Sequence, residues 1–403
     1  MAETGRLKRY LAAAAGCAIA FCAFTSLRHA FMGDQDAPPL KACFIYNGDG
    51  STPYTANFMK AQRRVEEIFQ GAVTTEERYN VPEGSVGEAL DSLSSSGCGI
   101  IFSNSYGYGN GMKEYARSHP GIEFCQSTCS NANEDPVLPN YHTFMGHIHE
   151  GRYASGVAAG MKLRELIKSG RVDASKARAG YVAAFPVPEV ISGYTAFILG
   201  VRSVVPNATM VVRYTGMWSD YMKEKRTARL LIEEDGCAVI SQHSDTTGPA
   251  VACEESEPPH EAYCVSYNES MADVAPTAYL TGTRINWEPY IAGAVKAVLC
   301  KKPIEQAVSG QIRGNDAGSG FKDGWVAMLE VNTYAAADGT TERLALLSKA
   351  FSEGSVSVFK AGATGADPED PGDRIDLSGG YEECRDQSAP SFHYVLDGIV
   401  TVK

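Results

Sequence analysis

The feature that most constrains this 403-residue chain is a regular alternation of short apolar segments with longer segments of helical periodicity. Short apolar segments, expected to be buried strands, lie at 42–46, 99–102, 122–126, 181–185, 209–214 and 237–241. Segments of helical periodicity lie at 58–69, 112–118, 153–168, 189–204 and 222–233. Such alternation is typical of parallel sheets covered by helices on both faces. Its recurrence after residue 150 predicts an α/β protein of two doubly wound lobes, each with its own core.

The charge balance excludes one class of partner. The chain carries 36 basic and 48 acidic residues, a net charge of −12. Nucleic-acid binding needs clustered Lys and Arg to neutralise phosphates, and the sequence shows no such cluster. We therefore expect no nucleic-acid partner and interpret the acidity as favouring solubility.

Residues 1–30 have the pattern of an export signal or a membrane anchor. A basic start is followed by an uncharged stretch at 11–27, which is typical of secretory signals. Seventeen helical residues span about 25 Å, slightly less than a hydrocarbon core of about 30 Å. Ala14-Ala15-Gly16-Cys17 resembles a bacterial lipobox, so Cys17 is a candidate for lipidation. A lipid anchor, an uncleaved helix and a cleaved signal remain open, and residues 31–40 are expected to form a polar tether.

Cysteine spacing suggests two disulfides. Among 11 cysteines, Cys125 and Cys129 are close enough to pair, as are Cys253 and Cys264 around an acidic loop. Connectivity cannot be deduced from sequence, and a cysteine can equally be a small buried hydrophobic residue. The second interpretation is favoured for Cys98, Cys237 and Cys300. Paired C-x-x-C or Cys/His spacing is absent, so no metal is expected.

The loops after the expected strands carry the unusual residues. Ligands of open parallel sheets bind beyond the carboxyl ends of the strands, so a cleft is expected there. The loop at 103–109 (SNSYGYG) combines aromatic faces with glycines that let backbone approach a ligand closely. It lacks the spacing of a dinucleotide fingerprint, and the chain shows no P-loop, H-E-x-x-H or nucleophile-elbow motif. We therefore assign no cofactor and no catalytic residue.

The segments around these loops resemble the basic membrane protein (BMP) family of ABC transporter substrate-binding proteins, the PnrA-like purine nucleoside receptors. The resemblance rests on AGYVAAFPVPEVISGYTAFILGVRSVVPNATM, VISQHSD, EGRYASGVAAG and DGWVAMLEVN, and it extends over most of 41–401. It implies the type I periplasmic-binding fold, in which two Rossmann-like lobes are joined by three crossing segments. From the family pattern, the crossings are expected near 141–150, 279–287 and 311–323.

The resemblance also implies a domain organisation and a function. Lobe 1 is expected at 41–145, lobe 2 at 146–283, a return to lobe 1 at 284–322, and the completion of lobe 2 with a tail at 323–403. The implied function is a non-enzymatic extracytoplasmic receptor that captures a purine nucleoside, a purine base or a related ring compound. Its partners would be an ABC permease and ATPase, and it would sit at the outer face of the cytoplasmic membrane or in the periplasm. A membrane-tethered sensor and a nucleoside hydrolase remain alternatives.

A purine needs aromatic faces for its ring and polar groups for its edges. The aromatic candidates are Tyr54, Tyr106, Phe185, Trp218 and Trp287. The polar candidates are Asp49, Asn57, Ser105, Glu189, His243, Asp245 and Asp323. For His243 and Asp245 we expect ligand hydrogen bonding and not catalysis.

Structural alternatives stay open for several of these residues. Turn formation or helix capping competes for Asp49 and Asn57, and hinge packing competes for Trp287. Glu150 and Arg152 are expected to form an ion pair at the hinge. The family's usual first-loop Trp is replaced here by Thr52-Pro53. Stacking is therefore expected from opposite lobes, through Tyr106 and Trp218.

Overall fold

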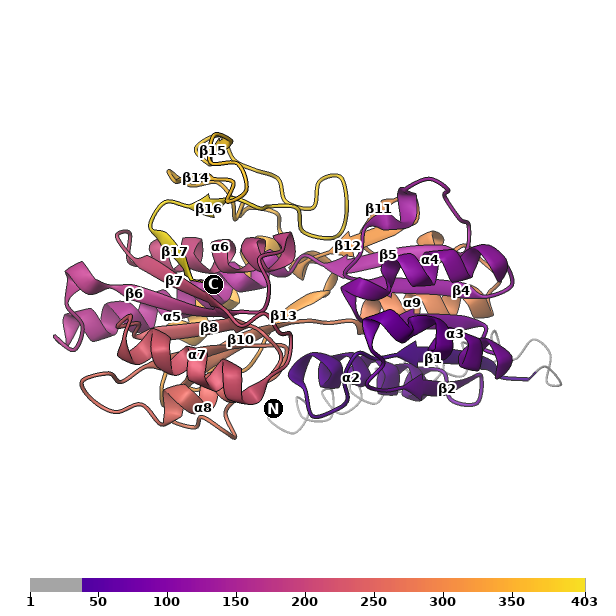
Figure 1. The fold of residues 1–403 in the computed structure, drawn as a ribbon, viewed down its shortest axis with the longest axis horizontal. Coiled ribbons are helices and arrows are strands. Elements are labelled where there is room, and N and C mark those ends of the chain that lie inside the picture. Colours follow the sequence, from indigo (N-terminus) through magenta and orange to yellow (C-terminus); the bar gives the residue numbers. More distant parts are fainter. Residues whose placement is uncertain (1–37, 403) are drawn as a thin grey trace, which may run out of the picture.

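The computed structural model describes residues 38–402, which form two lobes lying side by side (Figure 1). Each lobe is built on a seven-stranded, mostly parallel sheet. Within 38–402 no helix is both long enough and apolar enough to cross a membrane. The expected signal or anchor at 1–30, with Cys17, and most of the expected tether lie outside the described residues.

Lobe 1 contains the sheet of order β11-β12-β5-β4-β3-β1-β2. Its strands are β1 (Leu40–Ile45), β2 (Val73–Arg78), β3 (Ile100–Ser103), β4 (Glu123–Ser127), β5 (Tyr141–Gly146), β11 (Gln311–Arg313) and β12 (Asp316–Ser319). Its helices are α2 (Pro53–Ile68), α3 (Val86–Ser95), α4 (Gly109–Ser118) and α9 (Glu288–Leu299). Within this sheet, only β11 runs antiparallel to its neighbour.

Strand β1 shows why the sequence contains continuous apolar runs. Phe44 packs in the cluster formed with α2 and α9, whereas Cys43 and Ile45 pack in the cluster formed with α3 and α4. Successive side chains of a strand point to opposite faces, so a strand buried on both faces lacks polar alternation. Helices therefore cover both faces of the sheet, as the alternation predicts.

Lobe 2 contains the sheet of order β13-β10-β9-β8-β6-β7-β17. Its strands are β6 (Arg178–Ala183), β7 (Thr209–Tyr214), β8 (Val239–His243), β9 (Tyr263–Tyr267), β10 (Tyr279–Ile285), β13 (Val326–Met328) and β17 (Ile399–Val402). Its helices are α5 (Ile148–Lys168), α6 (Pro188–Arg202), α7 (Tyr221–Glu233), α8 (Gly248–Glu254) and α10 (Thr340–Ser352). The fold class predicted from the sequence, two doubly wound lobes, is confirmed.

Helices α5 and α6 pack unusually closely. A Cβ atom at Gly156 would lie 2.0 Å from the carbonyl oxygen of Phe197, and one at Gly200 would lie 2.1 Å from that of Tyr153. Any side chain at either position would therefore push the helices apart. This contact explains Gly156 and Gly160 of the EGRYASGVAAG segment and Gly200 of α6.

Three segments of the chain cross between the lobes. They lie between β5 and α5, between β10 and α9, and between β12 and β13, at residues 147, 286–287 and 320–325. After α10 the chain forms a small sheet of β14 (Thr364–Ala366), β15 (Arg374–Asp376) and β16 (Val395–Leu396). Strand β17 then joins the edge of lobe 2 beside β7.

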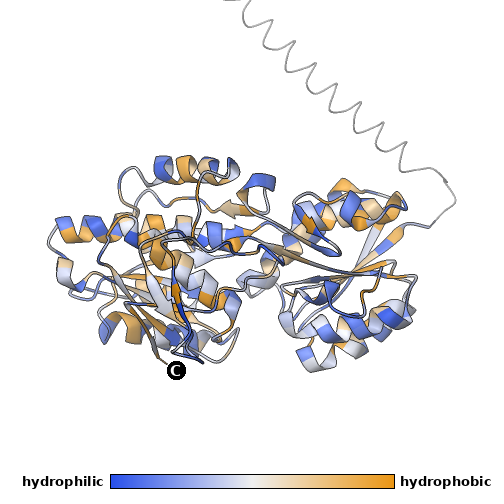
Figure 2. Cartoon of the chain, turned by 90° about the horizontal axis from the view of Figure 1, so that it is seen from above, coloured by the Kyte–Doolittle hydropathy of each residue, from blue (hydrophilic) through white to orange (hydrophobic). Residues whose placement is uncertain are grey.

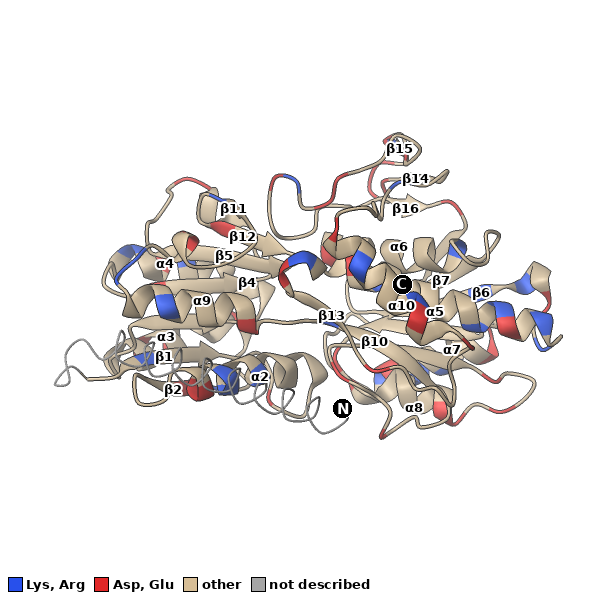
Figure 3. Ribbon diagram, turned by 180° about the vertical axis from the view of Figure 1, so that it is seen from behind, with Lys and Arg blue, Asp and Glu red and all other residues tan. Residues whose placement is uncertain are grey.

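The distribution of residue types follows the two-lobed architecture. Figure 2 shows hydrophobic residues along the strands, with helices that alternate hydrophobic and hydrophilic positions. Lys, Arg, Asp and Glu lie mainly on the helices and loops, while the strands are largely uncharged (Figure 3). This pattern is expected for sheets that are buried between layers of helices.

The disulfide predictions are wrong. Within 38–402, a disulfide joins Cys43 to Cys98, whereas the thiols of Cys125, Cys129, Cys253 and Cys264 remain free. Cys125 packs in the core beside α2 and α9, while the Cys129 sulfur donates to the Tyr106 carbonyl oxygen. Cys253 and Cys264 share a core cluster without a bond. Of the three cysteines expected to be unpaired and buried, Cys237 is so, whereas Cys98 is in the disulfide and Cys300 is exposed.

Candidate functional site

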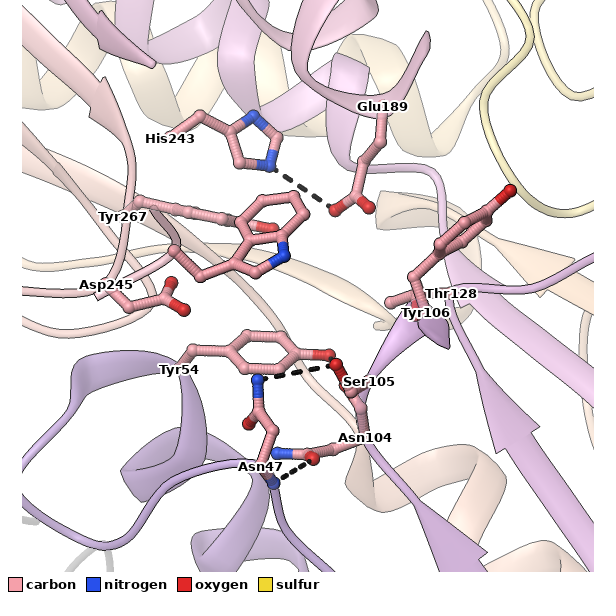
Figure 4. A pocket seen from close by; sticks show the side chains of 11 residues that line it. Asn47, Tyr54, Asn104, Ser105, Tyr106, Thr128, Glu189, His243, Asp245 and Tyr267 are labelled. Atoms are coloured by element: carbon pink, nitrogen blue, oxygen red, sulfur yellow. Dashed lines mark hydrogen bonds and ion pairs between the residues drawn. The ribbon is translucent and has the colours of Figure 1, made fainter. Parts of the chain in front are cut away.

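A pocket lies between the lobes, at the carboxyl ends of the parallel strands (Figure 4). It contains about 360 Å³ of space, part of it open to solvent, and eleven residues line it. Lobe 1 contributes Asn47, Tyr54, Asn104, Ser105, Tyr106 and Thr128, and lobe 2 contributes Glu189, Trp218, His243, Asp245 and Tyr267. A pocket of this size suits a small molecule that touches both lobes.

The lobe 1 wall is a set of loops tied together by hydrogen bonds. The Tyr54 hydroxyl donates to the Asn104 carbonyl oxygen at 2.5 Å, and the Asn47 backbone N–H donates to the Asn104 side-chain oxygen at 2.9 Å. These bonds connect the start of α2 to the loops that follow β1 and β3. The Asn104 Nδ2 atom is buried and has no partner among the described residues. It is therefore a free donor at the pocket.

The lobe 2 wall is organised around a buried histidine. His243 ends β8, and its Nε2 atom lies 3.3 Å from a carboxylate oxygen of Glu189, at the start of α6. The His243 ring packs edge-on against Tyr267, and the Arg152 guanidinium lies 3.6 Å from the centre of the Tyr267 ring. Burial, and then the charge of Arg152, lower the pKa of His243 despite the contact with Glu189. The imidazole is therefore neutral and serves as a hydrogen-bonding group.

Asp245 supplies a carboxyl group that the described protein leaves unpaired. Its backbone N–H donates to the Trp218 carbonyl oxygen at 2.8 Å, but no described residue forms a hydrogen bond or ion pair with its side chain. Burial raises its pKa well above the ordinary value, and the charges of Glu224 and Glu189 add to the rise while Arg152 opposes it. The residue is still partly exposed. An unpaired carboxyl in such surroundings is available to a ligand's N–H or O–H groups.

The aromatic residues at the pocket differ in exposure. Tyr54 is 9% exposed, whereas Tyr106 is 63% exposed, and Figure 4 shows the Tyr106 ring at the rim with its hydroxyl directed away from Tyr54. Trp218 is half-buried and packs edge-on against Phe185, with ring centres 5.2 Å apart. Stacking of a ring between Tyr106 and Trp218 stays a prediction, and Tyr54 is a second lobe 1 candidate.

Seven of the twelve predicted ligand-binding residues line the pocket, namely Tyr54, Ser105, Tyr106, Glu189, Trp218, His243 and Asp245. The other five do not. The Asp49 carboxylate accepts hydrogen bonds from the N–H and hydroxyl of Ser51 and from Asn80, which is the turn-forming role considered above.

The remaining four predicted residues also lie outside the pocket lining, and each contacts other residues of the protein. Asn57 donates from Nδ2 to the Ile285 carbonyl oxygen at 2.7 Å, beside the second crossing. Phe185 packs behind Trp218. Trp287 is buried against Phe58 with ring centres 4.7 Å apart, as the hinge-packing alternative expects. Asp323 accepts from the Ser319 hydroxyl at 2.6 Å.

Four pocket residues were missed by sequence reasoning: Asn47, Asn104, Thr128 and Tyr267. Asn47 and Asn104 directly follow or lie shortly after the strands expected at 42–46 and 99–102, where Asn is also an ordinary turn residue and so gives a weak signal. Thr128 follows β4, and Tyr267 ends β9. The run YCVSY at 263–267 is the signal that could have predicted strand β9 and, at its end, Tyr267.

The expected ion pair of Glu150 with Arg152 does not form, because α5 directs the two side chains to different neighbours. Glu150 accepts from the Phe321 N–H at 2.8 Å, within the third crossing. Arg152 is fully buried and donates from Nη1 to the Gln242 carbonyl oxygen at 2.8 Å. Arg152 is therefore a buried positive charge close enough to the pocket to oppose the rise in the Asp245 pKa.

Glu150 gives a pH-dependent contribution to stability. Burial raises its pKa from 4.5 to about 7, and the Phe321 hydrogen bond opposes the rise only in part. The folded state binds the Glu150 proton more tightly than the unfolded state does. The contribution of Glu150 to the free energy of unfolding is therefore greatest below pH 4.5, and it falls as the pH rises towards 7. Replacing Glu150 by Gln is expected to raise the free energy of unfolding by about 2 kcal/mol at pH 8. Urea unfolding at pH 5 and pH 8 tests this, and an equal effect at both pH values would contradict it.

The comparisons with known proteins agree in class. Residues 43–358 match the family described as ABC transporter substrate-binding protein PnrA-like. A purine-binding protein of Brucella abortus is 29% identical over 293 residues, which cover 72% of this chain and 75% of that protein. A Haloferax volcanii protein described as an ABC transporter glucose-binding protein is 27% identical, covering 66% of this chain and 63% of its own length.

A solved structure supports the fold independently. An ABC transporter solute-binding protein from Aeropyrum pernix K1 matches with a TM-score of 0.64, covering 78% of this chain and 92% of its own. The sequence identity is only 14%. This likeness therefore bears on the arrangement of the lobes and not on the ligand.

Proposed function

Because the chain belongs to the PnrA-like family of ABC transporter substrate-binding proteins, we propose that it captures a purine nucleoside or purine base between its lobes. It is a solute-binding protein of an ABC importer, a class that is non-enzymatic in general. The purine proposal is supported by the Brucella abortus relative, whose name states that it binds purines.

The observation that carries the proposal is the mixed lining of the interlobe pocket. Aromatic rings come from both lobes, through Tyr54 and Trp218, and polar groups without partners come from Asn104 and Asp245. A purine has flat apolar faces and polar edges, so it matches both features. The free Asn104 donor suits a ring nitrogen or carbonyl oxygen, and the Asp245 carboxyl suits an amino group or a pair of ribose hydroxyls.

The charge of the lining narrows the ligand class. Two carboxyl groups, Glu189 and Asp245, face the pocket, and neither Lys nor Arg is among the lining residues within 38–402. A phosphate needs cationic or backbone N–H partners, and the lining offers carboxyl groups in their place. The proposed ligand is therefore a nucleoside or base without phosphate.

A thermal-shift and calorimetry panel tests the proposal directly. It contains purine bases, purine nucleosides, the matching nucleotides, pyrimidine nucleosides and glucose, the sugar named in the Haloferax volcanii relative. Saturating purine nucleoside or base is expected to raise the melting temperature by several degrees, because ligand binding to the folded state alone stabilises it. The nucleotides should give a much smaller shift. A response to glucose and not to any purine compound would overturn the proposal, and release of free base during incubation would point to the hydrolase alternative.

The mode of membrane attachment is a separate part of the proposal. The lipobox-like segment ending at Cys17 supports a lipid anchor, which would hold the receptor beside its permease. Intact-mass analysis of protein extracted from membranes decides the matter. A diacylglycerol adduct on a chain that begins at Cys17 would support lipidation, whereas a chain that retains Met1 would leave a helical anchor.

A further inference from the structure

We propose that residues 381–392 form a C-terminal clasp that joins the two lobes and stabilises their arrangement in this structure. This segment lies beyond residue 358, where the match to the family ends. Figure 1 shows this part of the chain, in yellow, running over the junction between the lobes near β12. The three covalent crossings are thus supplemented by a fourth, non-covalent connection.

The clasp is fixed firmly to lobe 2. Phe392 is fully buried and stacks on Phe359 with ring centres 4.7 Å apart. The Glu383 carboxylate, on a residue only 8% exposed, accepts from the Ser192 hydroxyl of α6 at 3.2 Å and from the Phe392 N–H at 3.1 Å. Glu189 and Ser192 both belong to α6, so the clasp is attached to the helix that carries a pocket residue.

The clasp also forms hydrogen bonds with lobe 1. The Ser388 N–H donates to Asp316 Oδ2 at 2.5 Å, and the Ser388 hydroxyl donates to Asp316 Oδ1 at 2.6 Å. Thr143 of β5 donates to the same carboxylate at 2.8 Å. Ser388 and Asp316 are both fully buried. A second bond runs from the Arg313 guanidinium to the Cys384 carbonyl oxygen.

These contacts couple the clasp to the opening of the cleft. Asp316 is on β12, just before the third crossing. Ser388 lies in the segment that Glu383 and Phe392 anchor to lobe 2. A rotation of the lobes would pull the two residues apart or drag the clasp from its seat. Separation would leave a buried carboxylate with fewer donors, which is costly. By contrast, the Lys60–Glu269 ion pair across the lobes is partly exposed and contributes little.

The test uses the ligand-free protein, so its outcome does not depend on the identity of the ligand. Ser388→Ala removes one clasp donor, and Asp316→Asn removes the charged acceptor. Ser391→Ala is the matched control, because the hydrogen bonds of the Ser391 hydroxyl within 38–402 go to Tyr381 and Glu383, on the lobe 2 side. Hydrogen exchange is followed in the clasp and in two cleft segments, 47–57 and 243–247. The radius of gyration is measured by solution scattering.

Both clasp variants are expected to exchange about fivefold faster in the clasp and in the cleft segments, and to have a larger radius of gyration than wild type. Ser391→Ala should match wild type in the cleft segments. Faster exchange confined to 381–392, with unchanged cleft segments and radius, would show that the segment is only local packing and would overturn the proposal. Unchanged exchange everywhere in Ser388→Ala and Asp316→Asn would overturn it equally. Failure of the purine panel would leave these outcomes untouched.

Discussion

Replacing Asp245 by Ala is expected to weaken purine nucleoside binding by about 100-fold, because a hydrogen bond to a charged or strongly polar group contributes about 1.5–3 kcal/mol. The Asp245 side chain has no partner among the described residues, so a ligand that enters the pocket meets an available carboxyl group. Without it, the ligand's N–H or O–H groups would be buried and unpaired. Isothermal calorimetry with the tightest-binding compound of the purine panel measures the change.

Asp49→Ala is the matched control for this prediction. Asp49 has the same chemistry and lies in the first loop, but its carboxylate is bound by Ser51 and Asn80 outside the pocket. Its removal is expected to change binding by less than about twofold, since surface substitutions away from a site have small effects. Equal losses in the two variants would show that the ligand is held by the first loop. Wild-type binding by a folded Asp245→Ala would exclude the carboxyl from recognition.

The predicted fold follows from signals that are local in the sequence. Strands buried on both faces, such as β1 and β6, are short apolar runs, whereas α5 and α6 are segments of 21 and 15 residues, too long for typical strands. Strand β2 was not predicted because its sequence, VTTEER, is polar at an edge of the sheet. The extension after α10 has little regular structure, so periodicity gives no prediction there.

The pocket is only partly predictable for a related reason. The rule that loops at the carboxyl ends of strands line the cleft finds the correct loops, but not which side chains within them are free. Asp49 and Asp245 look alike in sequence, and only the contacts show that one carboxylate is bound by its own turn. Asn104 looks like an ordinary turn residue in sequence. The structure shows that its side-chain oxygen accepts from the Asn47 N–H, while its Nδ2 atom stays without a partner among the described residues. The hydrogen-bond partner that decides the role is close in sequence for Asp49 and distant in sequence for Asn104.

Removing the Cys43–Cys98 disulfide is expected to lower the free energy of unfolding of lobe 1 by about 4 kcal/mol, the value that chain entropy gives for a loop of this size. The bond links Cys43 of β1 to Cys98, two residues before the start of β3, and it closes a loop with a sequence separation of 55. These strands are paired neighbours in the sheet, so the bond joins residues that the folded sheet already holds close together, and it constrains the unfolded chain. Urea unfolding of the Cys43→Ala/Cys98→Ala variant measures the loss.

Tryptophan fluorescence is a suitable probe, since Trp287 and Trp325 pack in the lobe 1 core and report mainly on that lobe. Cys300→Ala is the control, because Cys300 is a free and exposed thiol whose loss is expected to change stability by less than about 0.5 kcal/mol. Adding a reducing agent to the wild-type protein should lower its stability towards that of the double variant and leave the double variant unchanged. If the double variant unfolds at the wild-type urea concentration, the disulfide does not stabilise this lobe. A loss as large in Cys300→Ala would instead point to a general effect of cysteine replacement.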